Sequence, residues 1–261
     1  MVAAGTLSNE KGSFNVQVPS LIENRNDLLN IPIKASSDSV ITLSDVAEVR
    51  DTFREKVGYA RNNGEPAIIL EVSKRAPSGV NSQPWKIYVV MGDARDKLVN
   101  EACEKFDKGE LEKEEYQVYP TERPDWYKAR QRASGFALYG AVGIGREDAD
   151  KRIVQARKNY ELFGAPVGVF VTVHKSVGPN GWGHVGHLIQ NICLASVDAG
   201  LATCLQEAWA GFPNLVKRHV GYSDEEILWC GIALGYEDSN HPVNSFRTER
   251  EEFESYAKIL E

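Results

Sequence analysis

The stretch KRAPSGVNSQPWKIYVV, residues 74 to 90, reads as the end of a helix, then a turn that begins at Pro77, then a buried strand rich in β-branched and aromatic residues. Two side-chain amides and an indole lie within it, at Asn81, Gln83 and Trp85. Amides both donate and accept hydrogen bonds, and an aromatic ring packs against a planar one. We therefore predict that this loop contacts a flat polar ligand. The simpler alternative is a connector whose polar side chains satisfy backbone groups.

Composition excludes several classes of function. The chain has 261 residues, of which 42% are hydrophobic and 26% charged, and its net charge is −7. This balance argues against a broad basic surface for nucleic acid, although a local cationic pocket remains open. No apolar run approaches the roughly 20 residues that span a bilayer, and the start MVAAGTLSNEKGSF lacks the apolar core of a signal peptide. We expect a cytoplasmic protein without a membrane or nucleic-acid partner.

Cysteine and histidine spacing predicts no metal site. None of the four cysteines forms a C-x-x-C pair, and no H-E-x-x-H motif is present. His184 and His187 are three residues apart at the start of a helix and could share a face, but no further ligands are identified. We interpret them as solvated or hydrogen-bonded histidines.

The character of the sequence changes near residue 75. Residues 12 to 73 read as short strands and turns, with one hairpin across Ser-Ser-Asp-Ser and a second hairpin signal at Asn63-Gly64 ahead of an apolar run. From Ala76 onward, amphipathic helices alternate with apolar strands, and residues 182 to 199 form an apolar helix. The pattern predicts a sheet covered by helices.

Residues about 12 to 75 resemble part of a transporter family. IPIKASSDSVITLSDVAEVRDTFREKVGYARNNGEPAIILEVSKR is similar to the periplasmic porter region of resistance-nodulation-division efflux pumps, with the IPI, LSDVAEV and NG-PA blocks in the same order. The pumps' transmembrane helices have no counterpart in this sequence. The resemblance therefore implies a packing or binding piece that transports nothing.

Residues 74 to 261 resemble the FMN-dependent nitroreductase family. The blocks that carry the resemblance are, in order, APSGVNSQPW, YGAVGIGREDADKR, NYELFGAPVGVF, GHLIQNICLASVDAGLATCLQEAW, GIALGYED and PVNSFRTERE. The resemblance implies an α+β fold with a mixed sheet flanked by helices, and an intertwined homodimer with FMN at each end of its interface. It also implies hydride transfer from NADH or NADPH through the flavin to nitroaromatics, quinones or similar small-molecule acceptors.

The resemblance also implies the flavin-binding residues. The first loop borders the flavin, CLQEAW approaches its central ring, and the NSFRTER segment lies near its phosphate. These cofactor-binding candidates are Pro77, Ser78, Gly79, Asn81, Gln83, Leu205, Gln206, Glu207, Ala208, Asn244, Arg247 and Arg250. Because the flavin itself carries the hydride, we assign no catalytic side chain.

Two candidate positions depart from residues common in the family. Leu205 and Ala208 stand where family members often have Pro and Gly, which weakens the case for a close backbone approach to the ring. Arg247 and Arg250 suit a phosphate dianion, because a guanidinium binds it with paired hydrogen bonds. Alternatively, the two arginines are solvated surface residues that balance the charge of the neighbouring glutamates.

The start of the nitroreductase-like part is the largest departure. Family members begin with a helix and an Arg-Arg-Ser-x-Arg type block that holds the phosphate, and the pump-like segment stands in its place here. We expect two domains, residues 1–75 and 76–261. An enzyme that tolerates the replaced start, with EPAIILEVSKR in the role of the missing helix, is one reading. A hybrid chain with little or no activity is the other.

Overall fold

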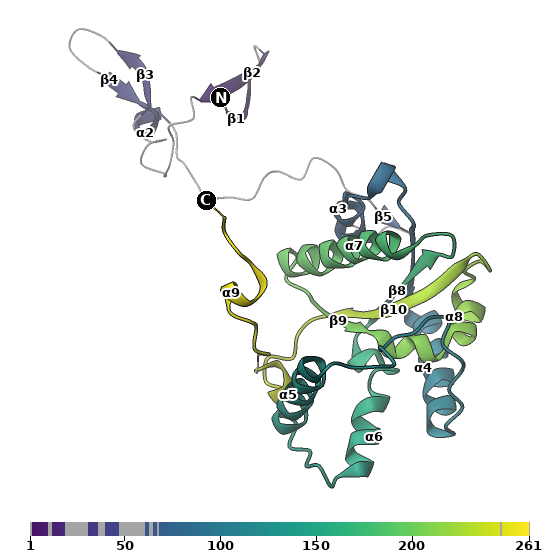
Figure 1. Ribbon diagram of the computed structural model, residues 1–261. Helices are drawn as coiled ribbons and strands as arrows, with labels where there is room; N and C mark the ends of the chain where they lie inside the picture. Colours follow the sequence, from purple (N-terminus) through teal and green to yellow (C-terminus); the bar gives the residue numbers. More distant parts are fainter. Residues whose placement is uncertain are drawn as a thin grey trace. The chain divides into compact units, whose positions relative to one another are not determined.

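A computed structural model describes residues 2–9, 12–18, 31–35, 40–46, 61–62, 65–66, 68–245 and 247–260 (Figure 1). The chain divides into two compact units, Met1–Gly58 and Tyr59–Glu261. Each unit is described by itself.

The described residues of the first unit form two antiparallel hairpins. Strand β1 (Val2–Asn9) pairs with β2 (Gly12–Val18), and β3 (Pro32–Ala35) pairs with β4 (Val40–Thr42). A short helix, α2 (Leu43–Val46), follows at once. The hairpin predicted across Ser-Ser-Asp-Ser is thereby confirmed.

The second unit begins upstream of the predicted boundary at residue 75. Strands β5 (Arg61–Asn62) and β6 (Glu65–Pro66) pair across Asn63-Gly64, as predicted. The apolar run that follows is a helix, α3 (Ile68–Ser73), and not a hairpin strand, in agreement with the reading of EPAIILEVSKR as a helix before the loop. Its side chains Ile69 and Leu70 pack against the core under helix α7 (Pro179–Asp198), so this segment belongs structurally to the second unit.

A four-stranded sheet organises the second unit, with strand order β7-β8-β10-β9. Its strands are β7 (Trp85–Met91), β8 (Val167–His174), β9 (Ala202–Gln206) and β10 (Glu226–Gly235). Every neighbouring pair is antiparallel, whereas the resemblance implied a mixed sheet. Strands β8 and β9 do run in the same direction, because α7 carries the chain back between them, but β10 lies between them.

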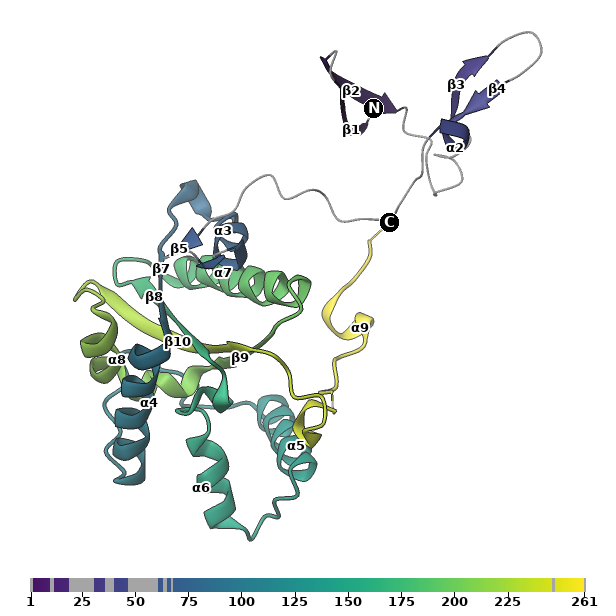
Figure 2. The same ribbon diagram turned by 180° about the vertical axis from the view of Figure 1, so that it is seen from behind.

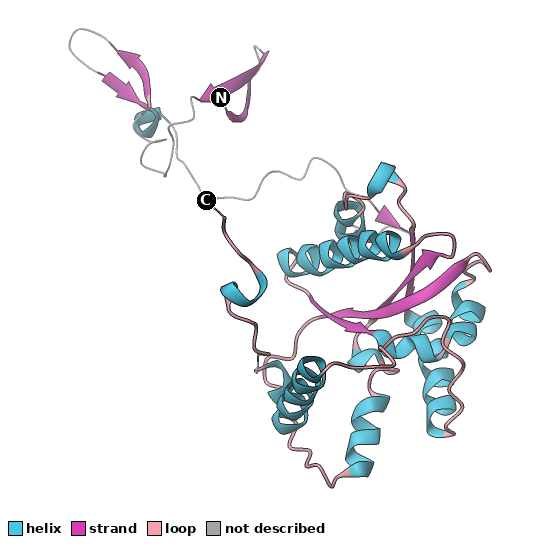
Figure 3. Ribbon diagram, viewed as in Figure 1, coloured by secondary structure: helices cyan, strands magenta, loops and turns pink. Residues whose placement is uncertain are grey.

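Helices cover both faces of this sheet (Figures 1 and 2). Helices α3 and α7 pack on one face, while α4 (Gly92–Asp107), α8 (Pro213–Val220) and the 3-10 turn η3 (Glu207–Gly211) pack on the other. Side chains alternate along β8 accordingly: Val169 and Val171 face α7, and Phe170 faces α4 and α8. The α+β prediction is confirmed (Figure 3).

The remaining elements lie between α4 and β8, before β7 or after β10. They are α5 (Asp125–Ala141), α6 (Ala149–Arg157), α9 (Phe253–Tyr256) and the 3-10 turns η1 (Gly79–Asn81), η2 (Leu162–Gly164) and η4 (Pro242–Asn244). Helix α5 has no buried residue, and its Phe136 is 63% exposed. Among the residues described, no helix combines the length and apolarity needed to cross a membrane.

Candidate functional site

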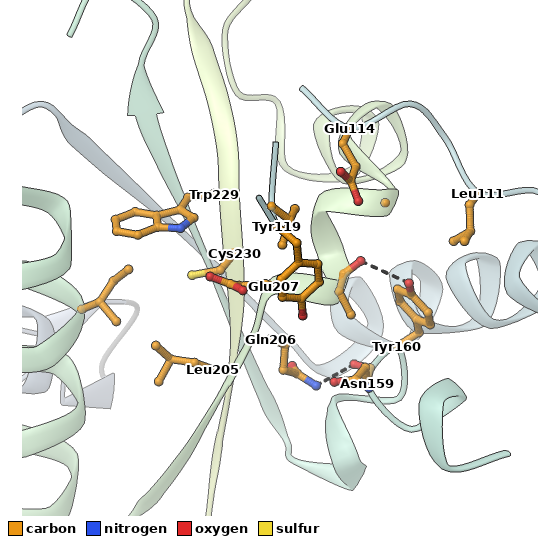
Figure 4. A pocket seen from close by; sticks show the side chains of 14 residues that line it. Leu111, Glu114, Tyr119, Asn159, Tyr160, Leu205, Gln206, Glu207, Trp229 and Cys230 are labelled. Atoms are coloured by element: carbon orange, nitrogen blue, oxygen red, sulfur yellow. Dashed lines mark hydrogen bonds between the residues drawn. The ribbon is translucent and has the colours of Figure 1, made fainter. Parts of the chain in front are cut away.

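A cavity of about 640 Å³ opens beside the end of β9 (Figure 4). Its walls come from the α4–α5 connection, the segment after α6, helix α7, and the β9–η3 and β10 backbone. The lining residues are Leu111, Glu114, Val118, Tyr119, Asn159, Tyr160, Ile189, Leu205, Gln206, Glu207, Ala208, Gly211, Trp229 and Cys230. The predicted segment 205–208 therefore forms one wall of a real cavity.

Two long-range hydrogen bonds fix that segment (Figure 4). Gln206, which is 1% exposed, donates from Nε2 to the carbonyl oxygen of Asn159 at 2.7 Å. The hydroxyl of Tyr160 donates to the carbonyl oxygen of Ala208 at 3.1 Å. Both partners lie in the turn after α6, so this turn holds the cavity wall in place from one side. Sequence reasoning did not identify Asn159 or Tyr160, because each acts across more than forty residues of chain.

Two titratable groups of the cavity, Glu207 and Cys230, are shifted toward their neutral forms. Burial raises the pKa of Glu207 above its ordinary value. Burial also raises the pKa of Cys230 to about 12, and the nearby Glu207 carboxylate adds to that shift. Among the described residues, no lysine, arginine or histidine lines the cavity. The cavity therefore suits an uncharged planar group, and the Cys230 thiol stays protonated at neutral pH.

The loop from Pro77 to Gln83 lies elsewhere, against the first half of α7. The backbone N–H of Gly79 donates to Nε2 of His184 at 3.2 Å, and Nδ1 of His187 lies 3.3 Å from the carbonyl oxygen of Pro77. Within the loop, Ser78 Oγ accepts from the backbone N–H of Gln83 at 3.0 Å. The interpretation of both histidines as hydrogen-bonded residues agrees with this geometry.

Three residues of this loop that are not glycine adopt left-handed backbone conformations. The φ angles are 49° at Val80, 56° at Asn81 and 42° at Gln83. Such conformations cost roughly 1–3 kcal/mol each and persist only where surrounding contacts over-determine them. Val80 is fully exposed, so its side chain contributes no packing toward that cost. The hydrogen-bond contacts with His184 and His187 of α7 therefore hold the loop in this conformation.

The role of His184 in holding the Pro77–Gln83 loop was not predicted from the sequence, which indicated only a solvated or hydrogen-bonded histidine. Because its Nε2 accepts a hydrogen bond, its proton lies on Nδ1, and that buried nitrogen has no partner among the described residues. A Cβ on Gly79 would lie 3.1 Å from His184 Cε1, so glycine permits this close approach. The sequence showed only that His184 lies three residues before His187 in a helix. That spacing does not indicate a hydrogen bond with Gly79, which lies 105 residues away in the sequence.

His184→Leu is expected to loosen the loop without unfolding the chain. Loss of one hydrogen bond, about 1 kcal/mol, should speed amide hydrogen exchange at Gly79 and its neighbours about fivefold. Global stability should change by less, because leucine also removes the unpartnered Nδ1–H. His184→Gln, whose amide oxygen can accept the same bond, is the control. Equal exchange in wild type and His184→Leu would show that His184 does not hold the loop.

The third predicted group lies in the C-terminal segment. Arg247 donates from Nη1 to the carbonyl oxygen of Asn244 at 2.9 Å, so these two residues do come together. Arg250 donates to its own neighbours, including Thr248 Oγ1 at 2.6 Å. Glu251 forms a 2.6 Å ion pair with Arg130 of α5, not with either predicted arginine. Of the twelve predicted residues, all of them described, only those from Leu205 to Ala208 line the 640 Å³ cavity.

Comparisons with known proteins agree with this architecture. Residues 38–236 match the model of the nitroreductase family, starting upstream of the boundary predicted at residue 75. A 4-nitrobenzoate reductase of Nocardioides sp. (strain LMS-CY) is 34% identical over 225 residues, which is 85% of this chain and 86% of that protein. The multidrug resistance protein MdtC of Proteus mirabilis is 26% identical over 76 residues, or 29% of this chain and 7% of that protein.

Two solved structures show the same fold. The FMN and NADPH-dependent nitroreductase NfnB from Sphigopyxis sp. strain HMH has a TM-score of 0.71 and 35% identity, over 75% of this chain and 88% of that chain. The FMN-dependent nitroreductase NfnB from Mycobacterium smegmatis, in complex with NADPH, has a TM-score of 0.70 and 25% identity, over 74% of this chain and 86% of that chain. By sequence and by fold, this chain belongs to the nitroreductase family.

Proposed function

We propose that this chain is an FMN-dependent oxidoreductase that passes hydride from NADH or NADPH to nitroaromatics, quinones or similar small-molecule acceptors. The observation that carries the proposal is the 640 Å³ cavity walled by residues from Leu205 to Ala208. Family membership and the FMN- and NADPH-dependent relatives confirm the prediction of a nitroreductase-type enzyme with these cofactors. The acceptor class follows from relatives that reduce nitroaromatic acids.

The cavity fits the ring of a flavin. Its volume lies within the range of small-molecule sites, and aromatic side chains such as Tyr119 and Trp229 line it. The buried Oε1 of Gln206 has no hydrogen-bond partner among the described residues, so the wall retains an unused acceptor. Bound FMN would supply the hydride chemistry there.

The protein's own contribution is position and exclusion of water. The hydrogen bonds from Tyr160 and to Asn159 hold the Gln206–Ala208 backbone, whose N–H groups can orient a ring laid against it. Leu205 is 50% exposed and offers an apolar surface beside that backbone. No side chain here needs to act as a catalytic acid, base or nucleophile.

The phosphate needs a separate cationic contact, because the described lining of the cavity includes no cationic side chain. Arg247, held at Asn244, supports a phosphate contact in the C-terminal segment, and Arg250 is a second candidate. We further propose that Ser78, Asn81 and Gln83 border the flavin from the second subunit, since they lie apart from the cavity in their own chain.

A homodimer would bring these groups together. The outer face of α7 carries exposed apolar side chains toward its C-terminal end: Leu194 is 59% exposed and Val197 is 68% exposed. Exposed apolar residues on one helix face, together with Leu205 at 50%, support burial against a second copy. The Leu194 and Val197 side chains would then lie in the interface.

One sedimentation experiment tests both proposals. The purified full chain, supplied with FMN, is expected to carry about one flavin per subunit and to sediment as a dimer that absorbs in the visible range. The same sample should oxidise NADH or NADPH when 4-nitrobenzoate or a quinone is added. Absence of bound flavin would contradict the flavin proposal, and flavin on a monomer would contradict the shared site.

The second candidate is a hybrid chain with little or no enzyme activity. We propose that residues 12–75 derive from a pump-like segment, and the partial MdtC match favours this. The missing arginine block would then weaken phosphate binding. Failure to retain flavin in the sedimentation experiment favours this candidate. A cytoplasmic location remains a proposal under either reading.

A further inference from the structure

A second cavity, of about 450 Å³, lies between α6, the turn after α5 and η4. None of the described residues that line it lines the first cavity. One wall is apolar and comes from three parts of the chain, namely Val142 and Ile144 of the turn, Val154 of α6, and Pro242 of η4. A wall of this kind suits the body of a small apolar ring.

The floor of this cavity carries an unused polar group. Gln155 is 8% exposed, lines the cavity, and its amide forms no hydrogen bond with any residue that the structure describes. The amide atoms themselves are not among the fully buried unpartnered polar atoms, so the exposed part of this side chain is its polar end, which opens to the cavity. The Gln155 amide is therefore available to a ligand in the cavity.

Cations face the same space from α6 and the residue that follows it. Lys151 and Gln155 lie in α6, and Lys158 is the C-cap residue; their spacings of four and three put them on one side of the helix. Lys151 is 3.2 Å from Asp148, whereas the Lys158 ammonium has no ion-pair partner in the described part of the chain. Asp150 also lines the cavity and opposes part of this charge.

His241 completes the polar lining. Its Nδ1 accepts from the backbone N–H of Val243 at 3.3 Å, so the ring is held and its Nε2 carries the proton. An N–H donor thus joins two ammonium groups and one free amide. On a chain whose net charge is −7, this cavity gathers more positive than negative side chains.

We propose that this cavity binds a small organic anion that carries a carboxylate on an apolar ring. The carboxylate meets the Lys158 ammonium and the Gln155 amide, and the ring packs on Val154 and Pro242. Inorganic phosphate would contact the cations but bury none of the apolar wall, so it should bind more weakly. The site is separate from the proposed flavin cavity and does not depend on it.

Benzoate is the probe. Calorimetric titration of the full chain without added FMN is expected to give one site per chain with a Kd of about 1 mM. Benzamide, which lacks the charge, and inorganic phosphate, which lacks the ring, should each bind about tenfold more weakly. With FMN present, benzoate also meets the proposed acceptor position at the flavin, so the titration without FMN is the one that reports on this cavity, and a failure of the flavin proposal would leave this test intact.

Matched variants locate the binding. Lys158→Met keeps the apolar stem and should weaken benzoate about tenfold, and Gln155→Leu about fivefold. Lys128→Met, which removes a lysine paired with Asp125 on α5 at 3.5 Å, is the control and should change nothing. Unfolding curves will show that the variants are folded. Benzoate binding that Lys158→Met leaves unchanged, or phosphate binding as tight as benzoate binding, would overturn the proposal.

Discussion

Glu226→Gln is expected to lower the free energy of unfolding by about 3 kcal/mol at pH 7. Glu226 opens β10 and is 2% exposed. Its carboxylate accepts from Thr172 Oγ1 at 2.6 Å, from Tyr88 OH at 2.8 Å and from the backbone N–H of Ser223 at 3.0 Å. Lys86 adds an ammonium at 3.1 Å.

Glutamine fits the space but not the chemistry. All of these partners donate hydrogen bonds, and the amide nitrogen of the substituted side chain would bring two further donors among them. The amide nitrogen would face other hydrogen-bond donors and find no acceptor. An unsatisfied buried donor lowers the free energy of unfolding by more than a lost hydrogen bond between satisfied groups does. The carboxylate links β10 to β7 through Tyr88 and to β8 through Thr172, and both links would be weakened.

The same network predicts a pH dependence. Burial by itself would raise the pKa of Glu226, but the hydrogen bonds from Thr172, Ser223, Tyr88 and Lys86 outweigh it and lower the pKa from 4.5 to about 2. Because the folded pKa lies below the unfolded one, the stabilisation is complete above about pH 4.5 and is lost as the pH falls toward 2. Wild type and Glu226→Gln should therefore converge in stability at low pH.

Urea unfolding at several pH values measures this effect. Glu225→Gln is the matched control, since Glu225 is exposed and its substitution should cost less than about 0.5 kcal/mol. A difference between wild type and Glu226→Gln that stays constant from pH 7 to about pH 2.5 would show that the Glu226 carboxylate is not the titrating group.

The network also shows what the sequence could and could not predict. The strand carrying Tyr88 and the strand ending at Gly235 follow from β-branched, aromatic and apolar runs, and both are confirmed. That Glu226 would close onto Tyr88 depends on a register between strands 138 residues apart, which local patterns do not encode. The hairpin at Asn63-Gly64 was predictable, because its two strands are joined by a short turn whose residues are adjacent in the sequence.

Residues 68–73 illustrate a different limit. The run IILEVS has β-branched character and follows a hairpin signal, but the next residues read as the end of a helix, so its local pattern left both readings open. It forms α3, because α7 offers an apolar face for Ile69 and Leu70. Tertiary packing overrides propensity in so short a segment. At the candidate site, the 205–208 wall was predictable from its motif, whereas the turn that holds it was not, since Asn159 acts through its backbone carbonyl.

Gly231→Ala is expected to destabilise the chain by about 1–3 kcal/mol and to weaken FMN binding as well. A Cβ at Gly231 would lie 2.4 Å from Cδ1 and 3.0 Å from Nε1 of Trp209. Trp209 is fully buried, and Phe170 and Tyr160 meet its ring edge-on at 5.0 and 5.4 Å between centroids. The indole has no free direction in which to move, so the backbone must shift.

That shift would reach the proposed flavin wall. Trp209 belongs to η3, directly after Glu207 and Ala208, and Gly231 pairs with Gln206 in the β9–β10 ladder. A displaced Trp209 therefore moves the same backbone that Tyr160 holds through Ala208. We expect the affinity for FMN to fall by about tenfold, in proportion to the lost fit of the wall.

Gly135→Ala is the matched control. Its Cβ would meet no atom within 4 Å, and inside α5 alanine favours the helix by up to about 1 kcal/mol. Thermal unfolding and FMN titration of both variants separate a local clash from a general effect of alanine. Trp209→Phe supplies the double-mutant test, because the smaller ring makes room for the new methyl group. If Gly231→Ala costs as much in the Trp209→Phe background as in wild type, the indole contact does not position this wall.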